Sequence, residues 1–376
     1  MKHVRTLALA GTALALALAG CAAPTTDGGA DGGSEPAEET TTGDAPQAGG
    51  DVTVTLYGDP WAAAVQAGAV AAFEEETGGA VEVALGDNAT WFAQLRASQG
   101  GDAPFDVMIL LPEQQIQAVE EGLVEPIDTS RLSNWDDVAP SLAEAFEQDG
   151  EQYGVPFSAG GLGIAYRKDL VETPPTAWSD MWDPEYAGHV AALPLTFQAG
   201  AQWFAGLVHE EGGTLDDPAA VDAAFGRLEE LAPAVSVTPN NAVGVQTALQ
   251  QGSAWLAPWW DGRAAALAQE DPNIAFAYPE SGATAAVTTF YVPANAPDKD
   301  ASYAFLDSLL DPGAQAEFAE AMWYPTSNVT TEFPAAFEGA VSADLETFDS
   351  YVFVDYATLT PNLTDWQNRW NEIFGG

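Results

Sequence analysis

Basic residues are scarce in this sequence of 376 residues, which contains 10 Lys and Arg but 56 Asp and Glu. The scarcity excludes nucleic acid as a partner, because phosphate binding needs clustered Lys and Arg side chains. It also disfavours electrostatic attraction to anionic lipid. A chain this acidic, with 10% aromatic residues, indicates a folded protein adapted for solubility, as in high salt. The bulk charge therefore says nothing about a ligand.

Cysteine and histidine are also nearly absent. The lone Cys21 excludes an intrachain disulfide, and His189 and His209 do not have the spacing of a helical zinc site. No Gly-x-Ser-x-Gly motif and no Walker phosphate loop occur. Catalysis by a carboxylate pair stays open, because 56 acidic residues offer many pairs. With 12 tryptophans and so few catalytic residues, we expect a protein that is not an enzyme, has no metal or cofactor, and binds a molecule without changing it.

The N-terminal region has the composition of a targeting segment. A basic start precedes an apolar run over 7–18, which is too short to span a membrane. The letters LAGC at 18–21 are typical of a bacterial lipobox, whose cysteine is lipidated and becomes the first mature residue; the alternative is an ordinary signal peptide and an incidental Cys21. We predict a signal peptide over 1–20 and a lipidated cysteine with a disordered acidic tether over 21–50. Only lipid would then hold the protein to the outer face of the cytoplasmic membrane, at the cell surface.

Strands and helices alternate after this region. The periodicity predicts a strand over 52–56, a helix ending at Gly78, a strand over 81–85, a helix around Trp91, a strand over 105–111 and a helix over 112–121. This alternation indicates a parallel, doubly wound sheet, and the second half of the chain repeats it. Ligands bind such sheets beyond the carboxyl ends of the strands. We therefore expect a site at the turns 57–61 and 110–113, which contain Asp59, Trp61 and Glu113.

The second half offers its own series of elements. They are a short helix capped by Thr176, a strand over 190–193, helices over 201–211, 218–232 and 264–269, strands over 274–278 and 285–292, and helices around Leu306, after Pro312 and around Trp366. A glycine-rich stretch over 153–166 comes before them and predicts a pair of strands. No helix start follows its glycines, so a phosphate-binding loop is disfavoured relative to backbone crowding or a crossing between two lobes.

Three tryptophans crowd into six residues, at Trp255, Trp259 and Trp260. They form part of the core or wall a cleft. The letters DG at 261–262 suit a strand-to-helix turn, which places Arg263 in the first turn of a helix, where free amide groups favour anions. Arg263 either binds an anionic ligand group or pairs with a carboxylate such as the neighbouring Asp261.

Motifs of a known family follow one another between residues 51 and 330. They read YGVPF at 153–157, WSDMWDPEYAG at 178–188, WDG at 260–262, YPE at 278–280, PANA at 293–296 and YPTSN at 324–328. Together with the lipobox and the tether, they resemble the spermidine/putrescine-binding type of the extracellular solute-binding proteins of ABC importers. The resemblance implies a two-lobe α/β fold of the type II periplasmic-binding-protein kind, in which each lobe is a doubly wound sheet and a hinge joins the lobes.

The resemblance also implies the organisation of the chain. One lobe would comprise 51–156 plus 287–325, and the other 157–286 plus 326–376. A monomer would capture a small-molecule solute in the cleft between the lobes, and hinge closure would present it to ABC permease subunits. Trp260 and Tyr324 match aromatic ligand contacts of the polyamine binders.

Other positions depart from the family pattern. Thr288, Gln198 and Ala201 stand where the polyamine binders have carboxylates for the ammonium groups of the ligand. In the first lobe, Leu111 and Glu113 align with Ser and Tyr contacts, and an aromatic contact falls at about Asp59, close to Trp61.

A dication in a cleft needs opposing charge, and Arg263 beside Trp260 would repel it. Asp59, Asp261 and Glu113 supply some negative charge. We expect instead a small organic solute with a carboxylate or other anionic group, held by Arg263 and stacked on Trp260. Polyamine binding is the alternative.

Two other classes stay open. A ferric-ion binder would need clustered tyrosines, but Tyr57, Tyr166, Tyr291 and Tyr324 are dispersed along the chain. A surface hydrolase would need a nucleophile or an acid/base pair, and no motif supplies one.

Overall fold

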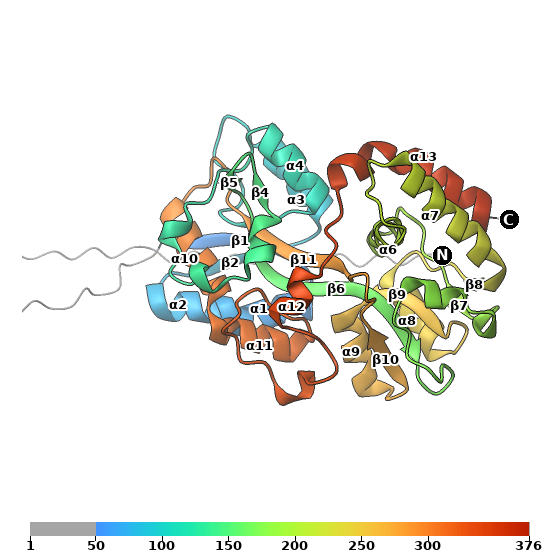
Figure 1. Cartoon of the computed structure of the whole chain (residues 1–376). Coiled ribbons are helices and arrows are strands. Elements are labelled where there is room, and N and C mark those ends of the chain that lie inside the picture. Colours follow the sequence, from blue (N-terminus) through green and yellow to red (C-terminus); the bar gives the residue numbers. More distant parts are fainter. Residues whose placement is uncertain (1–49, 376) are drawn as a thin grey trace, which may run out of the picture. The chain divides into compact units, whose positions relative to one another are not determined.

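The computed structural model describes residues 50–375, and the predicted signal peptide, Cys21 and tether over 21–49 lie outside this range. The strands are β1 (Val52–Leu56), β2 (Val81–Leu85), β3 (Met108–Ile109), β4 (Glu147–Gln148), β5 (Glu151–Gln152), β6 (Val155–Arg167), β7 (Val190–Ala191), β8 (Val235–Val237), β9 (Leu256–Trp260), β10 (Ile274–Ala277) and β11 (Thr284–Tyr291). The α-helices are α1 (Trp61–Val65), α2 (Ala71–Thr77), α3 (Asn88–Ala97), α4 (Pro112–Glu120), α5 (Pro140–Glu144), α6 (Gln198–Glu210), α7 (Pro218–Leu231), α8 (Ala242–Gln250), α9 (Asp261–Glu270), α10 (Lys299–Leu310), α11 (Pro312–Met322), α12 (Leu345–Asp349) and α13 (Tyr356–Phe374) (Figure 1).

Local signals in the sequence fix many of these boundaries. Helix α11 begins at Pro312, and the Asp311 carboxylate accepts a hydrogen bond from the Ala314 amide at 2.8 Å. Gly78 ends α2 in the left-handed conformation, with φ of 72°, which glycine adopts without steric cost. The predicted strands over 52–56 and 81–85 are β1 and β2, which pair in parallel.

The α/β class is confirmed, but the expectation of purely parallel sheets is wrong at the centre of the molecule. The large sheet has the order β3-β11-β6-β9-β7-β8, and β10 also pairs with β6. The pairs of β6 with β9, β10 and β11 are antiparallel, as is β3 with β11, whereas β7 is parallel to β8 and β9. The reason is that the chain crosses between two hydrophobic cores on β6 and returns on β11, so these strands run in opposite directions.

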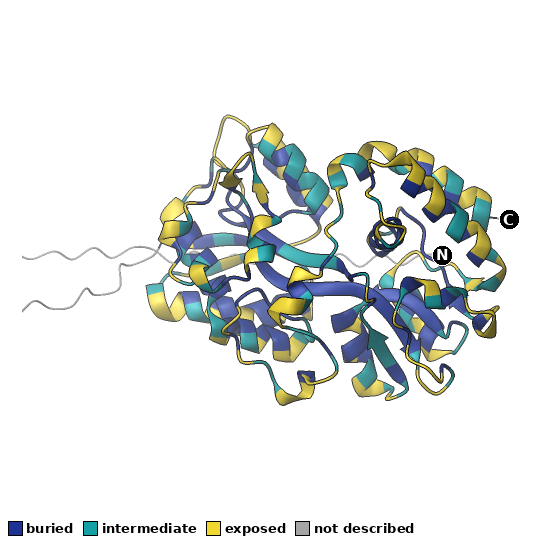
Figure 2. Ribbon diagram, viewed as in Figure 1, coloured by how far each residue is buried: buried dark blue, intermediate teal, exposed yellow. Residues whose placement is uncertain are grey.

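The glycine-rich stretch over 153–166 is one strand and not the predicted pair. Strand β6 runs over 13 residues and is buried along nearly its whole length (Figure 2). Its glycines do not turn the chain; they make room for neighbouring side chains. A Cβ at Gly161 would come within 3.0 Å of the Tyr351 ring, and one at Gly163 within 2.6 Å of both the Phe276 ring and the Ala277 carbonyl oxygen. The backbone crowding expected for this stretch is therefore confirmed.

Three smaller expectations also differ from the structure. The strand expected over 105–111 is reduced to the two residues of β3, although Val107 bridges Val54. Thr176 does not cap the following helix; the Asp180 carboxylate accepts the amides of Thr176 and Ala177 from inside that short 3-10 helix. Helix α6 begins at Gln198, three residues before its predicted start, because Phe197 is already the extended residue at its N-terminus.

Two hydrophobic cores define two lobes. The core of the first lobe draws on residues between 52 and 157 and between 290 and 318. The core of the second lobe draws on residues between 162 and 274 and between 359 and 370. Strand β6 contributes to both cores, with Val155 and Phe157 in the first and Leu162 and Ile164 in the second. Burial of the largest side chains, such as Phe157 in the first and Trp203 in the second, supplies the main stabilising term.

The segment between α11 and α13 packs against residues of both lobes. Phe337 and Val341 cluster with Ala265 of α9 and Ala319 of α11. Phe348 and Tyr351 form another cluster with Ala139, Leu142, Ala159 and Ala283. Residues of both lobes thus contact this segment, and the lobe boundaries expected from the sequence stay a prediction.

Candidate functional site

A cavity of about 440 Å³ is lined by both lobes. The first lobe contributes the turn 57–61 after β1 and the residues 109–112, which lead from β3 into α4. The second lobe contributes the first residue of α6 and the junction between β9 and α9. Residues of β6, β11 and the end of α11 complete the lining: Ser158, Ala286, Val287, Thr288, Ala321, Met322 and Tyr324. The two turns that follow predicted strands therefore lie at the same cavity.

The structure brings seven of the nine predicted ligand-binding residues to this cavity. They are Asp59, Trp61, Gln198, Trp260, Arg263, Thr288 and Tyr324. Glu113 and Asp261 are not among the lining residues. Sequence reasoning missed Ser158 and Met322, because neither a serine inside a buried strand nor a methionine at the end of a helix carries a recognisable signal.

Trp260 is the tryptophan of the 255–260 cluster that faces the cavity. Its indole Nε1 donates a hydrogen bond to Gln202 Oε1 at 2.8 Å, and Phe197 packs against it edge-on at 5.6 Å between ring centroids. Its neighbour Trp259 is buried in the core, since adjacent residues of a strand point to opposite faces. Trp255 stacks on His189 at 3.8 Å between ring centroids. The three tryptophans therefore have different environments, and Trp260 is the one whose ring is held in place at the cavity.

Tyr324 crosses from the end of α11 to the second lobe and rests against two glycines. A Cβ added at Gly160 of β6 would lie 2.7 Å from Tyr324 Cδ1, and one added at Gly262 of α9 would lie 2.6 Å from the same atom. Side chains at either position would displace the ring. Burial raises the pKa of Tyr324, and the positive charge of nearby Arg263 acts against that rise. The Tyr324 ring is thus fixed beside Arg263, the one basic side chain that residues 50–375 contribute to the cavity lining.

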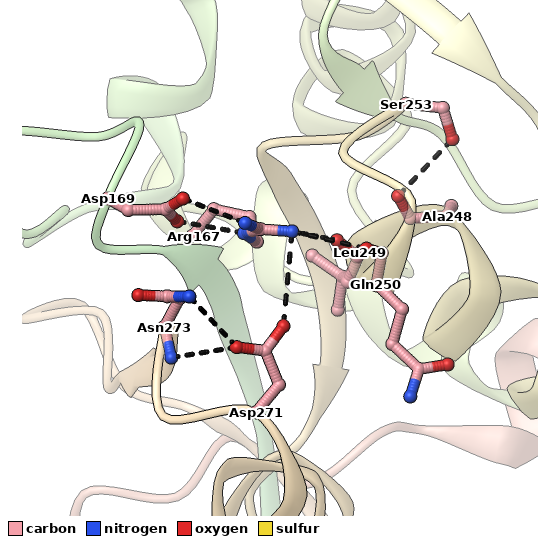
Figure 3. A network of polar contacts seen from close by, with 8 residues as sticks. All are labelled: Arg167, Asp169, Ala248, Leu249, Gln250, Ser253, Asp271 and Asn273. Atoms are coloured by element: carbon pink, nitrogen blue, oxygen red, sulfur yellow. Dashed lines mark hydrogen bonds and ion pairs between the residues drawn. The ribbon is translucent and has the colours of Figure 1, made fainter.

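Arg263 makes no ion pair with any residue in the range 50–375, although the chain is rich in carboxylates. Its guanidinium carbon lies 5.9 Å from the centroid of the Trp260 ring. Arg167 shows the contrasting arrangement: it pairs with Asp169 at 2.8 Å and with Asp271 at 4.0 Å, and donates to two backbone carbonyls (Figure 3). Apart from Arg263, only Lys168 lacks an ion pair among the basic residues of the described range, and Lys168 does not line the cavity.

The Asp261 side chain does not pair with Arg263, because its carboxylate is hydrogen-bonded inside the protein. The carboxylate is fully buried and accepts hydrogen bonds from the amides of Gly161 and Gly262, at 2.9 and 2.6 Å, and from the Tyr278 hydroxyl at 2.9 Å. Burial raises the pKa of Asp261 to about 7, against the lowering effect of these three donors. Asp261 therefore joins the crossing strand β6 to the start of α9 and does not reach the cavity.

Glu113 lies in the first turn of α4, directly after the lining residue Pro112. Burial raises its pKa. Its charge also contributes to the raised pKa of Tyr57, which burial, the larger cause, brings to about 12. Glu113 therefore adds negative potential behind the first-lobe wall without being part of the lining.

The described residues offer little for covalent or metal chemistry. Within 50–375 no group of three or more His, Cys, Asp and Glu side chains is arranged to hold a metal ion. In that same range no helix has the length and apolar character needed to cross a membrane. What the cavity offers is an aromatic wall, several polar side chains and two isolated charges, which suits reversible binding of a small molecule.

Curated relatives and solved structures resemble this chain over most of its length. The spermidine/putrescine-binding periplasmic protein of Escherichia coli is 28% identical over 279 residues, which cover 73% of this chain and 78% of the relative. A crystal structure of an extracellular solute-binding protein from Bordetella parapertussis superposes with a TM-score of 0.76 at 22% identity, and covers 86% of this chain and 98% of its own. A spermidine/putrescine ABC transporter substrate-binding protein from Streptococcus pneumoniae gives a TM-score of 0.71 at 19% identity, over 84% and 99% of the two chains.

These structures share the fold of this chain, with two lobes in an α/β arrangement. The match to a protein family covers residues 68–348, which include most of each core and most of the cavity lining. The chain belongs to the family of bacterial extracellular solute-binding proteins.

Proposed function

We propose that this protein is the substrate-binding subunit of an ABC importer, and that it captures a small organic solute in the 440 Å³ cavity between its lobes. The observation that carries the proposal is a cavity lined from both lobes, with a fixed aromatic ring and an arginine that forms no ion pair within residues 50–375. A solute bound there would touch both lobes, so binding would favour their closed arrangement. The closed form would then deliver the solute, chemically unchanged, to a membrane permease.

The solute carries an anionic group that Arg263 binds. Its guanidinium, which has no ion-pair partner in the described part of the chain, lies in the first turn of α9 and offers charge-assisted donors close to the positive end of a helix dipole. Trp260 beside it provides an apolar surface for the rest of the solute.

Polyamine binding, which the names of the relatives suggest, has weaker support in this cavity. Asp59 is the one acidic residue of the lining, and a dication would also have to lie near Arg263. Of the positions that would hold carboxylates in the polyamine binders, Thr288 and Gln198 line the cavity with uncharged side chains. A polyamine would therefore lose more hydration energy than one carboxylate returns.

Ferric-ion binding has less support still. Tyr57 and Tyr324 line the cavity, but Tyr166 is buried in the second core and Tyr291 in the first. The four tyrosines cannot meet at one ion.

Two substitutions test the binding site by isothermal titration calorimetry, with the solute first identified by native mass spectrometry of protein purified without denaturation. Arg263→Ala is expected to weaken binding by about 1.5–3 kcal/mol, the range for charge-assisted hydrogen bonds. Trp260→Ala is expected to weaken it through lost apolar contact, whatever the charge of the solute. At about a hundredfold excess over the Kd, the solute should also stabilise the wild-type fold by about 2.7 kcal/mol.

The matched control is Arg96→Ala, which removes an exposed arginine paired with Glu121, away from the cavity. It should leave the affinity unchanged. Unaltered binding in both Arg263→Ala and Trp260→Ala would contradict the proposed site. Recovery of a chemically modified solute would contradict the proposed transport function.

We also propose that lipid on Cys21 attaches the protein to the outer face of the cytoplasmic membrane. The support is the sequence LAGC at 18–21 and the absence of any other cysteine in the chain. Wild-type protein should partition into the detergent phase and carry a lipid mass on Cys21, and Cys21→Ser should be released or left unprocessed. A water-soluble wild-type protein with an unmodified Cys21 thiol would refute this attachment.

A further inference from the structure

Two side chains of opposite charge line the cavity. Asp59 lies in the turn after β1 of the first lobe, and Arg263 lies in the first turn of α9 of the second lobe. Both side chains are exposed. In the part of the chain that the structure describes, neither forms an ion pair, with the other or with any third residue.

Among the basic residues in the range 50–375, the lack of a carboxylate partner makes Arg263 unusual. Six other basic residues of the described range, including Arg167 with its two aspartates, have carboxylate partners. Arg263 is only two residues from Asp261, yet the three hydrogen bonds of the Asp261 carboxylate keep that group in the interior. The guanidinium therefore stays available at the cavity.

The charges around the cavity are also sorted by lobe. Glu113 stands behind the first-lobe wall, one residue after the lining residue Pro112, and adds negative charge on the side of Asp59. On the second-lobe side, the N-terminal residues of α6 and α9 both reach the lining, through Gln198 and Arg263. The amide groups at the start of α6 add to the positive side, whereas at the start of α9 the Asp261 carboxylate accepts the Gly262 amide and Arg263 provides the positive charge.

A solute with one kind of charge would meet an opposing charge in one lobe and a like charge in the other. Inside a cavity of about 440 Å³, the protein side chain with the same charge as the solute would lose hydration without gaining a partner of opposite charge. A solute with both charges would satisfy both lobes. The surfaces between them, which include Trp260, Tyr324 and Val287, would contact an uncharged spacer.

We propose that the solute is a small zwitterion, whose ammonium group binds toward Asp59 in the first lobe and whose carboxylate binds Arg263 in the second. This inference rests on the proposed solute-binding function and names the class of the ligand. Because each charged group of the solute binds a different lobe, the solute itself links the two lobes in the closed arrangement.

Three series of probes with matched chain lengths test the inference by calorimetry on the mature protein. They are unbranched ω-amino acids of about two to six carbons, and the diamines and dicarboxylates of the same lengths. We expect one or more ω-amino acids to bind about 10- to 100-fold more tightly than the diamine and the dicarboxylate of equal length, as expected when one charge-assisted contact is lost.

Reciprocal substitutions give a second readout. Asp59→Asn should weaken binding of the best ω-amino acid and strengthen binding of the matched dicarboxylate. Arg263→Gln should weaken binding of the same ω-amino acid and strengthen binding of the matched diamine. Asp365→Asn, an exposed residue of α13, is the control for the change in net charge and should alter none of the three affinities.

Each contrary outcome overturns the zwitterion. A dicarboxylate that binds as tightly as the amino acid, with no effect of Asp59→Asn, indicates a purely anionic solute. A diamine that binds most tightly and is insensitive to Arg263→Gln indicates a polyamine. Absence of heat with all three series also overturns it. The proposed function is judged separately by native mass spectrometry: it fails if no solute co-purifies with the protein or if the solute is recovered in a chemically modified form.

Discussion

Replacing Asp261 with alanine is expected to destabilise the folded protein by about 3 kcal/mol or more, because three donors lose their acceptor at once. The amides of Gly161 and Gly262 and the hydroxyl of Tyr278 all donate to this buried carboxylate. The Tyr278 hydroxyl in turn accepts the Ser342 amide at 3.0 Å. The loss therefore extends from β6 and α9 into the C-terminal segment. Urea denaturation with a two-state fit measures the change.

Asp261→Asn is the matched variant, since its amide oxygen still accepts hydrogen bonds while the group no longer titrates. It should be less destabilised than Asp261→Ala. It should still be less stable than the wild type, because its NH2 group cannot accept a hydrogen bond from the donor that it faces. Equal stability of the alanine variant and the wild type would contradict the structural role of this carboxylate.

The same group predicts a pH dependence of stability. Burial raises the pKa of Asp261 from 3.8 to about 7 in the folded protein, so the folded state binds more protons than the unfolded state between these values. The free energy of unfolding should therefore decrease as the pH rises from about 4 through 7, by on the order of 4 kcal/mol from this group when both pKa values are passed.

The free energy of unfolding at pH 5 and pH 8 gives the measurement. The wild type should lose more stability between these pH values than Asp261→Asn does. Parallel pH profiles of the two proteins would mean that other groups control the dependence.

Substitution of Gly160 is the second change with a large expected effect. A Cβ at this position of β6 would lie 2.7 Å from Tyr324 Cδ1 and 2.8 Å from Asp261 Oδ1. Gly160 is not among the glycines with positive φ, so the backbone itself accepts a side chain and the cost is steric. Gly160→Ala should destabilise the protein by about 1–3 kcal/mol, the usual cost of overpacking, and Gly160→Val by more.

The same substitution should reduce solute binding, because Tyr324 is a wall of the cavity and would have to move. Thermal denaturation and calorimetry on each variant separate the two effects. The control is Gly226→Ala in α7, where a Cβ meets no atom within 4 Å and where alanine should stabilise the helix slightly. Wild-type stability and affinity in Gly160→Val would show that the Tyr324 ring has room to shift.

Much of the local structure follows from the sequence alone. The alternation in β1 and β2, the glycine after α2 and the Asp-Pro start of α11 all act within a few residues, so periodicity and capping chemistry predict these elements. The strand-end rule pointed to the turns 57–61 and 110–113, and both reach the cavity. The motifs between 153 and 328 were enough to indicate the family.

Contacts between distant segments decided the rest. Gly160, Gly161 and Gly163 suggested a break between two strands, but their neighbours are side chains from as far along the chain as Tyr324 and Tyr351, and these keep β6 continuous. Local patterns contain no information about such partners.

The sequence by itself determined that the protein is an acidic α/β chain with a single cysteine, a tryptophan cluster and an arginine at the start of a helix. Only the tertiary structure decided which member of that cluster lines the cavity. Trp259 and Trp260 are neighbours in β9 with opposite orientations, and the packing of the second core determines which one is buried. Asp261 and Arg263 likewise differ in role because Gly161 of β6 and Tyr278, which follows β10, donate to the aspartate inside the protein, while Arg263 lines the cavity without an ion pair among residues 50–375.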